Sequence, residues 1–576
     1  MCGIGVLYES TESGLTKSKI EDALRCIANR GPDGGDATVL DNGMALLASV
    51  LHLRGLKCTR QPFRVRDCKD VLLWNGEVFG GHPVVSSTQS DTRRVFQVLS
   101  SLTRTDNNIG KNLLKSLDRI EGPWSVVYWH NDSQTLWFGR DRLGRRSLLL
   151  RYEKGDDDDN VLKSLRISSV LSVHDDEKYV VPTDKDRYKM IPSVWQAIPP
   201  IGLFGVRFKN DGSLHGFIHV PRTSSLLPSS SAAVVVTTKK TTGETTTKSS
   251  LSSCLEQTLR DAVKRRALDI SDSKGVAVLF SGGLDSAVIA AMLGQVLPKD
   301  NVVELINVCF DYPTYNSPDR DAALRVFQEL KVSQPKRKWR LILVNVTWKE
   351  VQEQARRVMN LIRPRETQMD FNIAIAMWFA ARGRGILASS LSSTPVPYIS
   401  KARVLLLGIG ADEQLGGYQR HRSQLQLKGE DGLREEMQMD VKRLWRRNLG
   451  RDDRVVSDLG KEIRLPYLDE SVTKLISSTP LRDLVGTSES SSFVNKKVLR
   501  DVAVSLGIKY AASLKKRAIQ FGSRIAKRSG IHIFGSVKKA NRSRAGVSLC
   551  SLSAILGDGF VTRTTSCSDV DEKKEK

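Results

Sequence analysis

Residues 276–287 read VAVLFSGGLDSA, a strand-like apolar run that leads directly into a turn with two adjacent glycines. A helical apolar stretch, Ala287–Leu297, follows the turn. Adjacent glycines let the backbone wrap closely around phosphate, and the N–H groups at the start of a helix attract an anion. Because no Gly-Lys-Ser/Thr follows, the turn is not a Walker loop. It predicts a nucleotide-binding loop that consists of Ser281, Gly282, Gly283, Asp285 and Ser286.

Strand-like and helical runs alternate around this loop. The strand-like runs are Gly275–Phe280, Val302–Phe310, Trp339–Val346 and Arg403–Leu407, and the helical ones are Leu284–Leu297 and Phe371–Ala381. Such alternation is typical of an α/β domain with a parallel sheet between helices. Nearer the N-terminus, short β-rich runs separated by Gly, Asn and Asp predict antiparallel sheets instead. These runs are Val71–Trp74, Trp124–Trp129 and Thr135–Phe138.

A Ser/Thr-rich segment separates the two patterns. Residues 221–250 contain no aromatic residue, so they cannot build a core and are expected to form a linker. We therefore predict a first domain at 1–220, a second at 251–536 and a polar tail at 537–576. The adjacent carboxylates at 155–160 repel one another and predict a solvated surface loop rather than a metal site.

The overall composition is that of a folded protein without membrane spans. Hydrophobic residues make up 40% and charged residues 26% of the 576 positions, and no apolar run approaches the roughly 20 residues that cross a bilayer. The N-terminus lacks the basic and apolar regions of a signal peptide, so we expect a cytoplasmic protein. Eight cysteines without a Cys-x-x-Cys pair exclude a disulfide scaffold and a zinc ribbon.

The basic charge does not by itself indicate a nucleic-acid partner. Lys plus Arg exceed Asp plus Glu by 24, but the basic residues are scattered. No basic-aromatic motif of the common nucleic-acid-binding modules accompanies them. We therefore expect small-molecule substrates rather than nucleic acid or a membrane. A protein partner or a homo-oligomer stays open.

Cys2 directly follows the initiator methionine, and a residue this small normally permits the methionine to be removed. The cysteine then carries a free α-amine, whose pKa near 7.7–8.0 lets it accept the thiol proton at neutral pH. A single cysteine is more often structural than catalytic, so this interpretation depends on the residues that follow it.

Short polar motifs follow Cys2 in order. They are RGPD at 30–33, HLR at 52–54, QP at 61–62, WNGEVF at 74–79, SDT at 90–92, EG at 121–122 and RDRLGRR at 140–146. This series resembles the class II glutamine amidotransferase domain, an α+β N-terminal-nucleophile (Ntn) glutaminase with antiparallel sheets sandwiched by helices. Taken singly, each motif also fits an ordinary turn or surface charge, and Asn75-Gly76 is a favoured turn dipeptide.

This resemblance implies that Cys2 attacks the side-chain amide of glutamine, which releases ammonia and leaves a γ-glutamyl thioester. Asn75 and the backbone N–H of Gly76 would form the oxyanion hole, where fixed donors stabilise charge that develops in the transition state. The implied substrate contacts are Arg54 for the α-carboxylate, Asp91 for the α-amine and Glu77 for the orientation of nearby groups. The motif at 75–80 lacks the Asn that usually closes it in this family.

The turn at 281–286 carries the Ser-Gly-Gly-x-Asp-Ser signature of ATP pyrophosphatases, which cleave ATP between its α- and β-phosphates and adenylate a substrate. The motifs that follow resemble those of asparagine synthetase in order, namely FDY at 310–312, DRDA at 319–322, GIGADEQLGGY at 408–418, EIRLPYLD at 462–469 and KKVLR at 496–500. This resemblance implies ATP and Mg²⁺ as cofactors, with Asp285, Asp412 and Glu413 near the metal and Lys516 on the pyrophosphate. The pair at 412–413 also fits a helix cap, and Lys516 a surface base. Asp370 is expected to be an N-cap, with a ligand role as the second interpretation.

Ile409 departs from asparagine synthetases, which carry a glutamate here that is thought to act as the base during ammonia attack. An isoleucine cannot move a proton, and a general base is typically worth about 10²–10⁴-fold in rate. The segments around Ile409 and after Lys516 resemble the subgroup of asparagine synthetase domain-containing proteins.

The sequence therefore leaves three functions open. The first is a carbon–nitrogen ligase that converts aspartate, glutamine and ATP into asparagine, glutamate, AMP and pyrophosphate. The second is a degenerate homologue with an ATP-binding or protein-binding role, motivated by Ile409 and by the long polar tail. The third keeps the adenylating chemistry and changes the acceptor.

Overall fold

The computed structural model describes residues 1–10, 15–102, 108–154, 162–171, 191–209, 214–223, 250–270, 274–365, 367–388, 394–486 and 493–534. The predicted acidic loop at 155–160, most of the predicted linker (224–249) and the predicted tail at 537–576 lie outside these residues. Among the helices of the described stretches, none combines the length and the apolar character needed to cross a membrane.

The N-terminal half contains two antiparallel sheets. The first has the strand order β11-β9-β10-β1-β3-β2. Its strands are β1 (Gly3–Glu9), β2 (Gly34–Val39), β3 (Ala45–Val50), β9 (Leu149–Lys154), β10 (Leu162–Ser168) and β11 (Gln196–Ala197). The second, of order β13-β12-β8-β7-β4, consists of β4 (Val71–Gly76), β7 (Trp124–His130), β8 (Thr135–Arg140), β12 (Gly202–Phe208) and β13 (Leu214–Pro221). A small separate pair joins β5 (Gly80–Gly81) to β6 (Ile120–Glu121).

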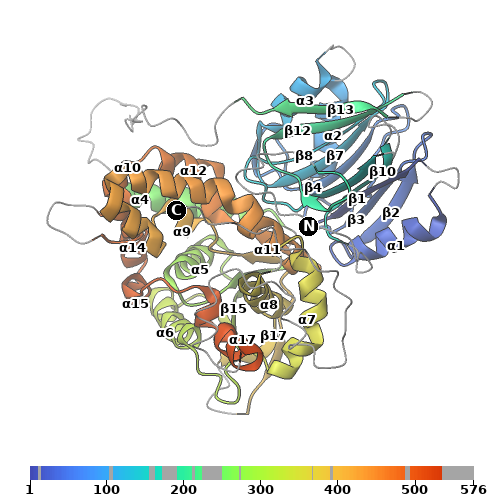
Figure 1. The fold of residues 1–576 in the computed structure, drawn as a ribbon. Coiled ribbons are helices and arrows are strands. Elements are labelled where there is room, and N and C mark those ends of the chain that lie inside the picture. Colours follow the sequence, from blue (N-terminus) through green and yellow to red (C-terminus); the bar gives the residue numbers. More distant parts are fainter. Residues whose placement is uncertain are drawn as a thin grey trace, which may run out of the picture.

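The two sheets pack face to face. Ile4 and Val6 of the first sheet share one buried core with Leu73, Val127 and Phe138 of the second, as expected for strands whose side chains alternate between faces. Helix α1 (Lys17–Ala28) covers the outer face of the first sheet, and α2 (Asp91–Leu102) and α3 (Ile109–Leu117) cover that of the second (Figure 1). The predicted α+β fold, with antiparallel sheets between helices, is confirmed.

The C-terminal half is built on one seven-stranded sheet of order β18-β17-β16-β15-β14-β19-β20. In this order, the five strands β16, β15, β14, β19 and β20 run parallel to one another. At the other end of the sheet, β17 and β18 pair antiparallel with their neighbours. The strands are β14 (Val276–Leu279), β15 (Val303–Cys309), β16 (Trp339–Asn345), β17 (Arg384–Leu387), β18 (Pro397–Ile399), β19 (Val404–Leu406) and β20 (Glu462–Arg464). The predicted parallel-sheet α/β fold of this half is confirmed.

Helices cover both faces of this sheet. Val276 and Val278 of β14 share a core with α4 (Leu251–Ala267), α5 (Leu284–Val296), α6 (Pro318–Ser333) and α14 (Lys497–Ser505). Ala277 lies in the opposite core with α7 (Trp348–Ile362), α8 (Gln368–Arg382) and α11 (Gly450–Ser457). The other helices are α9 (Ala411–Gln414), α10 (Gln419–Leu444), α12 (Glu470–Ser477), α13 (Leu481–Val485), α15 (Lys509–Ser513), α16 (Ile519–Gly522) and α17 (Ile525–Phe534).

The predicted cap of α8 was wrong. The N-cap is Thr367, whose side chain accepts a hydrogen bond from the backbone N–H of Asp370. Asp370 lies in the first turn of the helix, three residues after the cap, and pairs with Arg451 at 2.6 Å. Threonine and aspartate are both favoured at a cap, so the residue type alone did not separate the two positions.

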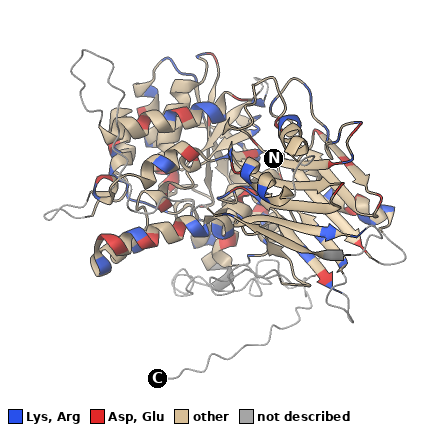
Figure 2. Cartoon of the chain, turned by 90° about the horizontal axis from the view of Figure 1, so that it is seen from above, with Lys and Arg blue, Asp and Glu red and all other residues tan. Residues whose placement is uncertain are grey.

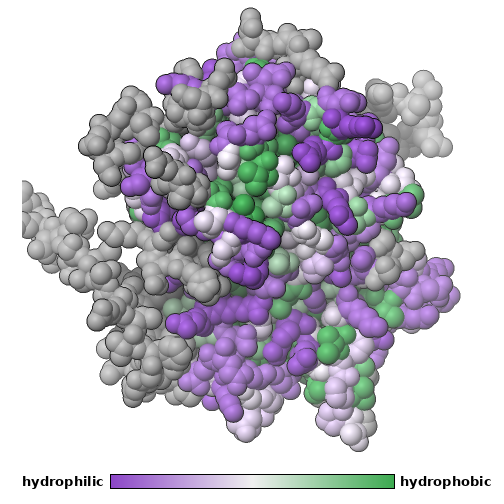
Figure 3. Space-filling model, turned by 90° about the vertical axis from the view of Figure 1, so that its right-hand side faces the viewer, coloured by the Kyte–Doolittle hydropathy of each residue, from purple (hydrophilic) through white to green (hydrophobic). Residues whose placement is uncertain are grey.

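The two halves meet through a buried, charged interface. Arg30 pairs with Asp453 of α11 at 2.7 Å, and Arg146 pairs with Glu462 of β20 at 3.1 Å; all four side chains are buried. The N-terminus lies between the halves (Figure 1). Elsewhere basic and acidic residues are intermixed (Figure 2), and the face in Figure 3 is mostly hydrophilic with small separate hydrophobic groups.

Candidate functional site

The structure brings the predicted glutaminase residues together around one pocket at this interface. Cys2 immediately precedes β1, whose place in the sheet fixes the start of the chain. The pocket has an empty volume of about 490 Å³. Its lining includes Cys2, Arg54, Gln61, Asn75, Gly76, Glu77, Asp91 and Glu462.

Asn75 and Gly76 end β4 beside the cysteine. The Asn75 side chain is fully buried, and neither of its amide atoms has a hydrogen-bond partner among the described residues. A side chain at Gly76 would place its Cβ 2.7 Å from the Trp74 ring and 2.8 Å from the Pro123 carbonyl, so only glycine fits. Buried amides are normally satisfied, which makes the free Asn75 side chain available to a bound ligand.

Gln61 holds this end of β4 in place. Its side chain accepts from the Trp74 N–H at 2.6 Å and donates to the Trp74 carbonyl at 3.0 Å. The same Nε2 lies 3.8 Å from the Cys2 sulfur. The sequence contained Gln61 within a motif but indicated no role, and the structure makes it a positioning residue between the cysteine and the strand.

Arg54 and Asp91 form a pair on the wall of the pocket. Arg54 Nη1 lies 3.1 Å from Asp91, and Asp91 also accepts the Val78 N–H at 2.9 Å. Burial raises the pKa of Asp91 to about 6, although Arg54 acts in the opposite direction. The same Arg54 Nη1 lies 2.8 Å from Asp269, which follows α4 in the C-terminal half. No sequence motif marked Asp269.

Glu77 faces the C-terminal half. It lies 3.5 Å from Arg464 of β20, and burial together with nearby Glu462 raises its pKa well above the usual range. Glu462 itself lies 3.6 Å from the Met1 amine. Burial lowers the pKa of this amine and raises that of the Cys2 thiol. While Met1 is present, the free α-amine of the chain belongs to Met1 and faces Glu462, and the Cys2 nitrogen is part of a peptide bond.

The predicted nucleotide loop lies at the C-terminal end of β14 and leads into α5. The Ser281 hydroxyl accepts from the Gly283 N–H at 3.2 Å, and the Ser286 hydroxyl donates to the Gly283 carbonyl at 3.1 Å. Gly282 has a φ of +74°, and a side chain there would collide with the backbone of Ala323. Ligands of α/β sheets bind at the carboxyl ends of the strands, which is where this loop stands.

A lysine joins two carboxylates beside the loop. Lys496 Nζ lies 2.7 Å from Asp285 and 2.6 Å from Asp412, and Lys516 also contacts Asp412. Burial would raise the pKa of Asp412, but the two lysines outweigh it and hold this pKa at about 2. Lys496 belongs to the KKVLR motif, but the sequence indicated no role for it, because its spatial partners lie far away in the chain.

Glu413, the third residue predicted near the metal, contacts Tyr418. Its carboxylate accepts from the Tyr418 hydroxyl at 2.5 Å. Neighbouring Ile409 is half-buried and packs against the core of α8 and α11. Within the described residues no group of three or more His, Cys, Asp or Glu side chains is placed to hold a metal by itself. A metal here would therefore need ligands from a bound substrate.

Comparison with known proteins assigns each half of the chain to a domain family. Residues 1–184 match the glutamine amidotransferase domain family, and residues 254–428 match the asparagine synthase family. Asparagine synthetase domain-containing protein 1 of Bos taurus is 34% identical, covering 92% of this chain and 96% of the relative. An asparagine synthetase domain-containing protein of Saccharomyces cerevisiae is 31% identical, covering 90% of this chain and 92% of the relative.

Among solved structures, glutamine phosphoribosylpyrophosphate amidotransferase of B. subtilis is 13% identical, with a TM-score of 0.26, and covers 56% of this chain and 70% of its own. The identity and coverage of the sequence relatives are decisive. The chain therefore belongs to the asparagine synthetase domain-containing proteins, which are asparagine synthetase-like members of the glutamine amidotransferases.

Proposed function

We propose that this protein is a glutamine-dependent, ATP-consuming ligase that converts aspartate into asparagine with release of glutamate, AMP and pyrophosphate. One observation carries the proposal: a single short segment touches both candidate sites. Glu462 lines the Cys2 pocket, and the hydroxyl of Tyr467, further along the same segment, donates to the carbonyl of Asp285 at 3.1 Å. Ammonia formed at Cys2 would reach the nucleotide loop by an internal path along this segment.

In the first half-reaction, the α-amine of Cys2, freed by removal of Met1, accepts the thiol proton. The sulfur attacks the amide carbon of glutamine, and the Gly76 N–H with the Asn75 side chain stabilises the oxyanion. The amine returns the proton to the departing ammonia, and water then hydrolyses the thioester to glutamate. Arg54 and Asp91 would hold the α-carboxylate and α-amine of the substrate.

In the second half-reaction, a carboxylate oxygen of aspartate attacks the α-phosphorus of ATP and displaces pyrophosphate. The backbone N–H groups of the loop and the ammonium groups of Lys496 and Lys516 would stabilise the charge on the phosphates. Carboxylate oxygens suit Mg²⁺, so Asp285 and Asp412 would hold this ion, which supplies positive charge to the phosphates when bound. Ammonia then attacks the β-aspartyl adenylate, and AMP leaves.

The Asp91 carboxylate predicts how glutamine binding depends on pH. Its pKa is raised to about 6, so it becomes protonated as the pH falls through 6 and loses the charge that holds the substrate α-amine. We expect the KM for glutamine to rise several-fold between pH 7.5 and 5.5 and to be high and pH-independent in Asp91→Asn. Steady-state glutaminase assays measure both; a flat wild-type KM over this range contradicts the role of Asp91.

Ile409 predicts a slow amidation step. A glutamate at this half-buried position would supply a general base beside the adenylate, so we expect Ile409→Glu to raise the rate of asparagine formation by about 10- to 100-fold. Ile409→Gln, which is similar in size but cannot act as a base, is the control and should not show the gain. An unchanged rate in Ile409→Glu would place the base elsewhere.

A product assay tests the proposed function as a whole. Purified protein with MgATP and aspartate is given either glutamine or ammonium, and AMP, asparagine and glutamate are quantified. AMP and asparagine in equal amounts support the proposal. AMP with another amide, formed when aspartate is replaced by a different acceptor, indicates a changed substrate. No AMP under any condition favours a binding role for a degenerate enzyme.

A further inference from the structure

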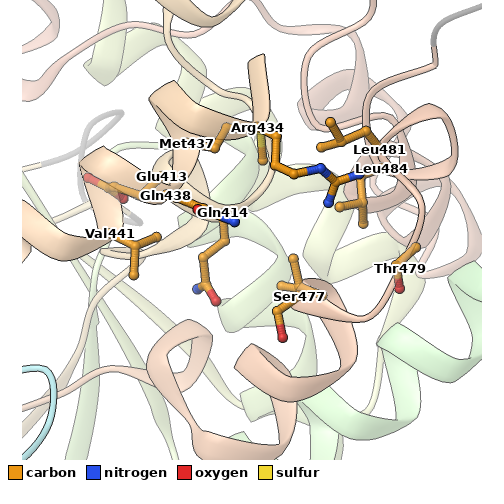
Figure 4. Close-up of a pocket in the computed structure, with 11 residues that line it drawn as sticks. Glu413, Gln414, Arg434, Met437, Gln438, Val441, Ser477, Thr479, Leu481 and Leu484 are labelled. Atoms are coloured by element: carbon orange, nitrogen blue, oxygen red, sulfur yellow. The ribbon is translucent and has the colours of Figure 1, made fainter. Parts of the chain in front are cut away.

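A cavity lies between α9, α10, α12 and α13 (Figure 4). It has an empty volume of about 570 Å³. Its wall is largely apolar, formed by Met437, Val441, Ile476, Leu481 and Leu484. It contains no residue of the 281–286 loop or of the Cys2 pocket. The cavity therefore lies apart from the 281–286 loop and the Cys2 pocket, although its lining includes Glu413, which the sequence predicts near the metal.

Gln414 offers this cavity a hydrogen-bond acceptor. The side chain is 4% exposed, and its Nε2 donates to the carbonyls of Gly410 at 3.0 Å and Tyr467 at 2.7 Å. The two bonds fix the amide, yet its Oε1 has no partner among the described residues. Burying an acceptor without a hydrogen-bond donor destabilises the folded protein, and an N–H group of a bound ligand would remove this penalty.

Two charged side chains also line the cavity, together with the polar residues Gln438, Ser477 and Thr479. Arg434 of α10 is half-buried, extends toward Leu484 in Figure 4, and forms no ion pair or hydrogen bond with the described part of the chain. A free guanidinium at the edge of an apolar cavity is suited to a carboxylate, which it can bind through two parallel N–H groups. Glu413, from α9, adds a carboxylate to the same lining.

We propose that this cavity binds an apolar α-amino acid such as leucine, isoleucine, methionine or phenylalanine. The carboxylate pairs with Arg434, the ammonium group donates to Gln414 Oε1, and the side chain packs against the apolar wall. Binding sites of this kind are mostly apolar, with a few polar groups that fix orientation. Aspartate is expected to bind more weakly than these amino acids, because the apolar wall would have to cover its second carboxylate. The site is thus an effector site, distinct from the proposed acceptor site.

Calorimetric titration of the full-length protein with these four amino acids tests the proposal. At least one is expected to bind, and Arg434→Gln is expected to weaken that binding tenfold or more. Arg482→Gln removes an exposed arginine of α13 that does not line the cavity, and it should bind as the wild type does. Leucinamide and 4-methylpentanoate, which lack the carboxylate and the amine, should each bind at least tenfold more weakly than leucine.

Thermal unfolding gives a second measurement. A ligand that binds only the folded state raises the unfolding temperature, so the bound amino acid should raise it in the wild type and in Arg482→Gln but not in Arg434→Gln. An absence of binding by all four amino acids overturns the proposal. So does equal binding by Arg434→Gln, or equally tight binding of aspartate. These measurements need no catalytic turnover, so they stand apart from the proposed ligase activity.

Discussion

Replacing Cys2 with alanine is expected to lower the glutamine-dependent rate at least about 10³-fold, because the variant loses the atom that bonds to the substrate. AMP formation with ammonium as the nitrogen source should stay within about twofold of the wild type, since that step takes place at the loop around Asp285. Parallel assays of glutamate and AMP with each nitrogen source measure the two effects.

Alanine is small, as cysteine is, so Met1 should still be removed from this variant. Cys58→Ala is the matched control, because Cys58 is a half-buried cysteine of the same half that does not line the pocket. It should keep both activities. Equal loss of the glutamine-dependent and ammonium-dependent rates in Cys2→Ala would contradict the division of labour between the two halves.

Lys496→Met is expected to lower AMP formation at least about 10²-fold with either nitrogen source. The ammonium group contacts both Asp285 and Asp412, and the loss of one fixed charge in a transition state commonly has an effect of this size. Glutamine hydrolysis at Cys2 should be far less affected. The measurement is initial AMP release with saturating MgATP and aspartate.

A neighbouring lysine provides the control for this variant. Lys497 is exposed and pairs with Asp501 on the surface of α14, where an ion pair contributes little. Lys497→Met should therefore keep its activity. Because Lys496→Met leaves buried Asp412 and half-buried Asp285 without the lysine between them, its unfolding temperature must be measured as well. A folded Lys496→Met protein with normal AMP release would exclude the proposed role of this lysine.

The fold was largely predictable because its signals are local. The apolar run and glycine turn at 276–286 are contiguous in the chain, and so are the strands Trp124–His130 and Thr135–Arg140. The side chains named for the glutaminase pocket do lie together around Cys2. Placing them together required the resemblance to a known domain, since spacing alone does not specify a three-dimensional neighbour.

The contacts that sequence reasoning missed are all distant in the chain. Asp269 reaches Arg54, Glu462 reaches the amino terminus, and Lys496 reaches Asp285. Asp269 belongs to no recognised motif, and the motifs that contain Glu462 and Lys496 do not name their partners, which are set by how helices and strands pack. Ile409 was different, because its departure from the expected glutamate was visible in the sequence itself.

The C-terminal half contributes Glu462 to the lining of the glutaminase pocket and Asp269 to the ion pair with Arg54, and this affects how the chain can be engineered. A chimaera that joins this amidotransferase half to a relative's ligase half would inherit foreign residues at both positions. Arg54 would then face the relative's residue at position 269. Such a chimaera should be active only if Asp269 and Glu462 are transferred together with the amidotransferase half.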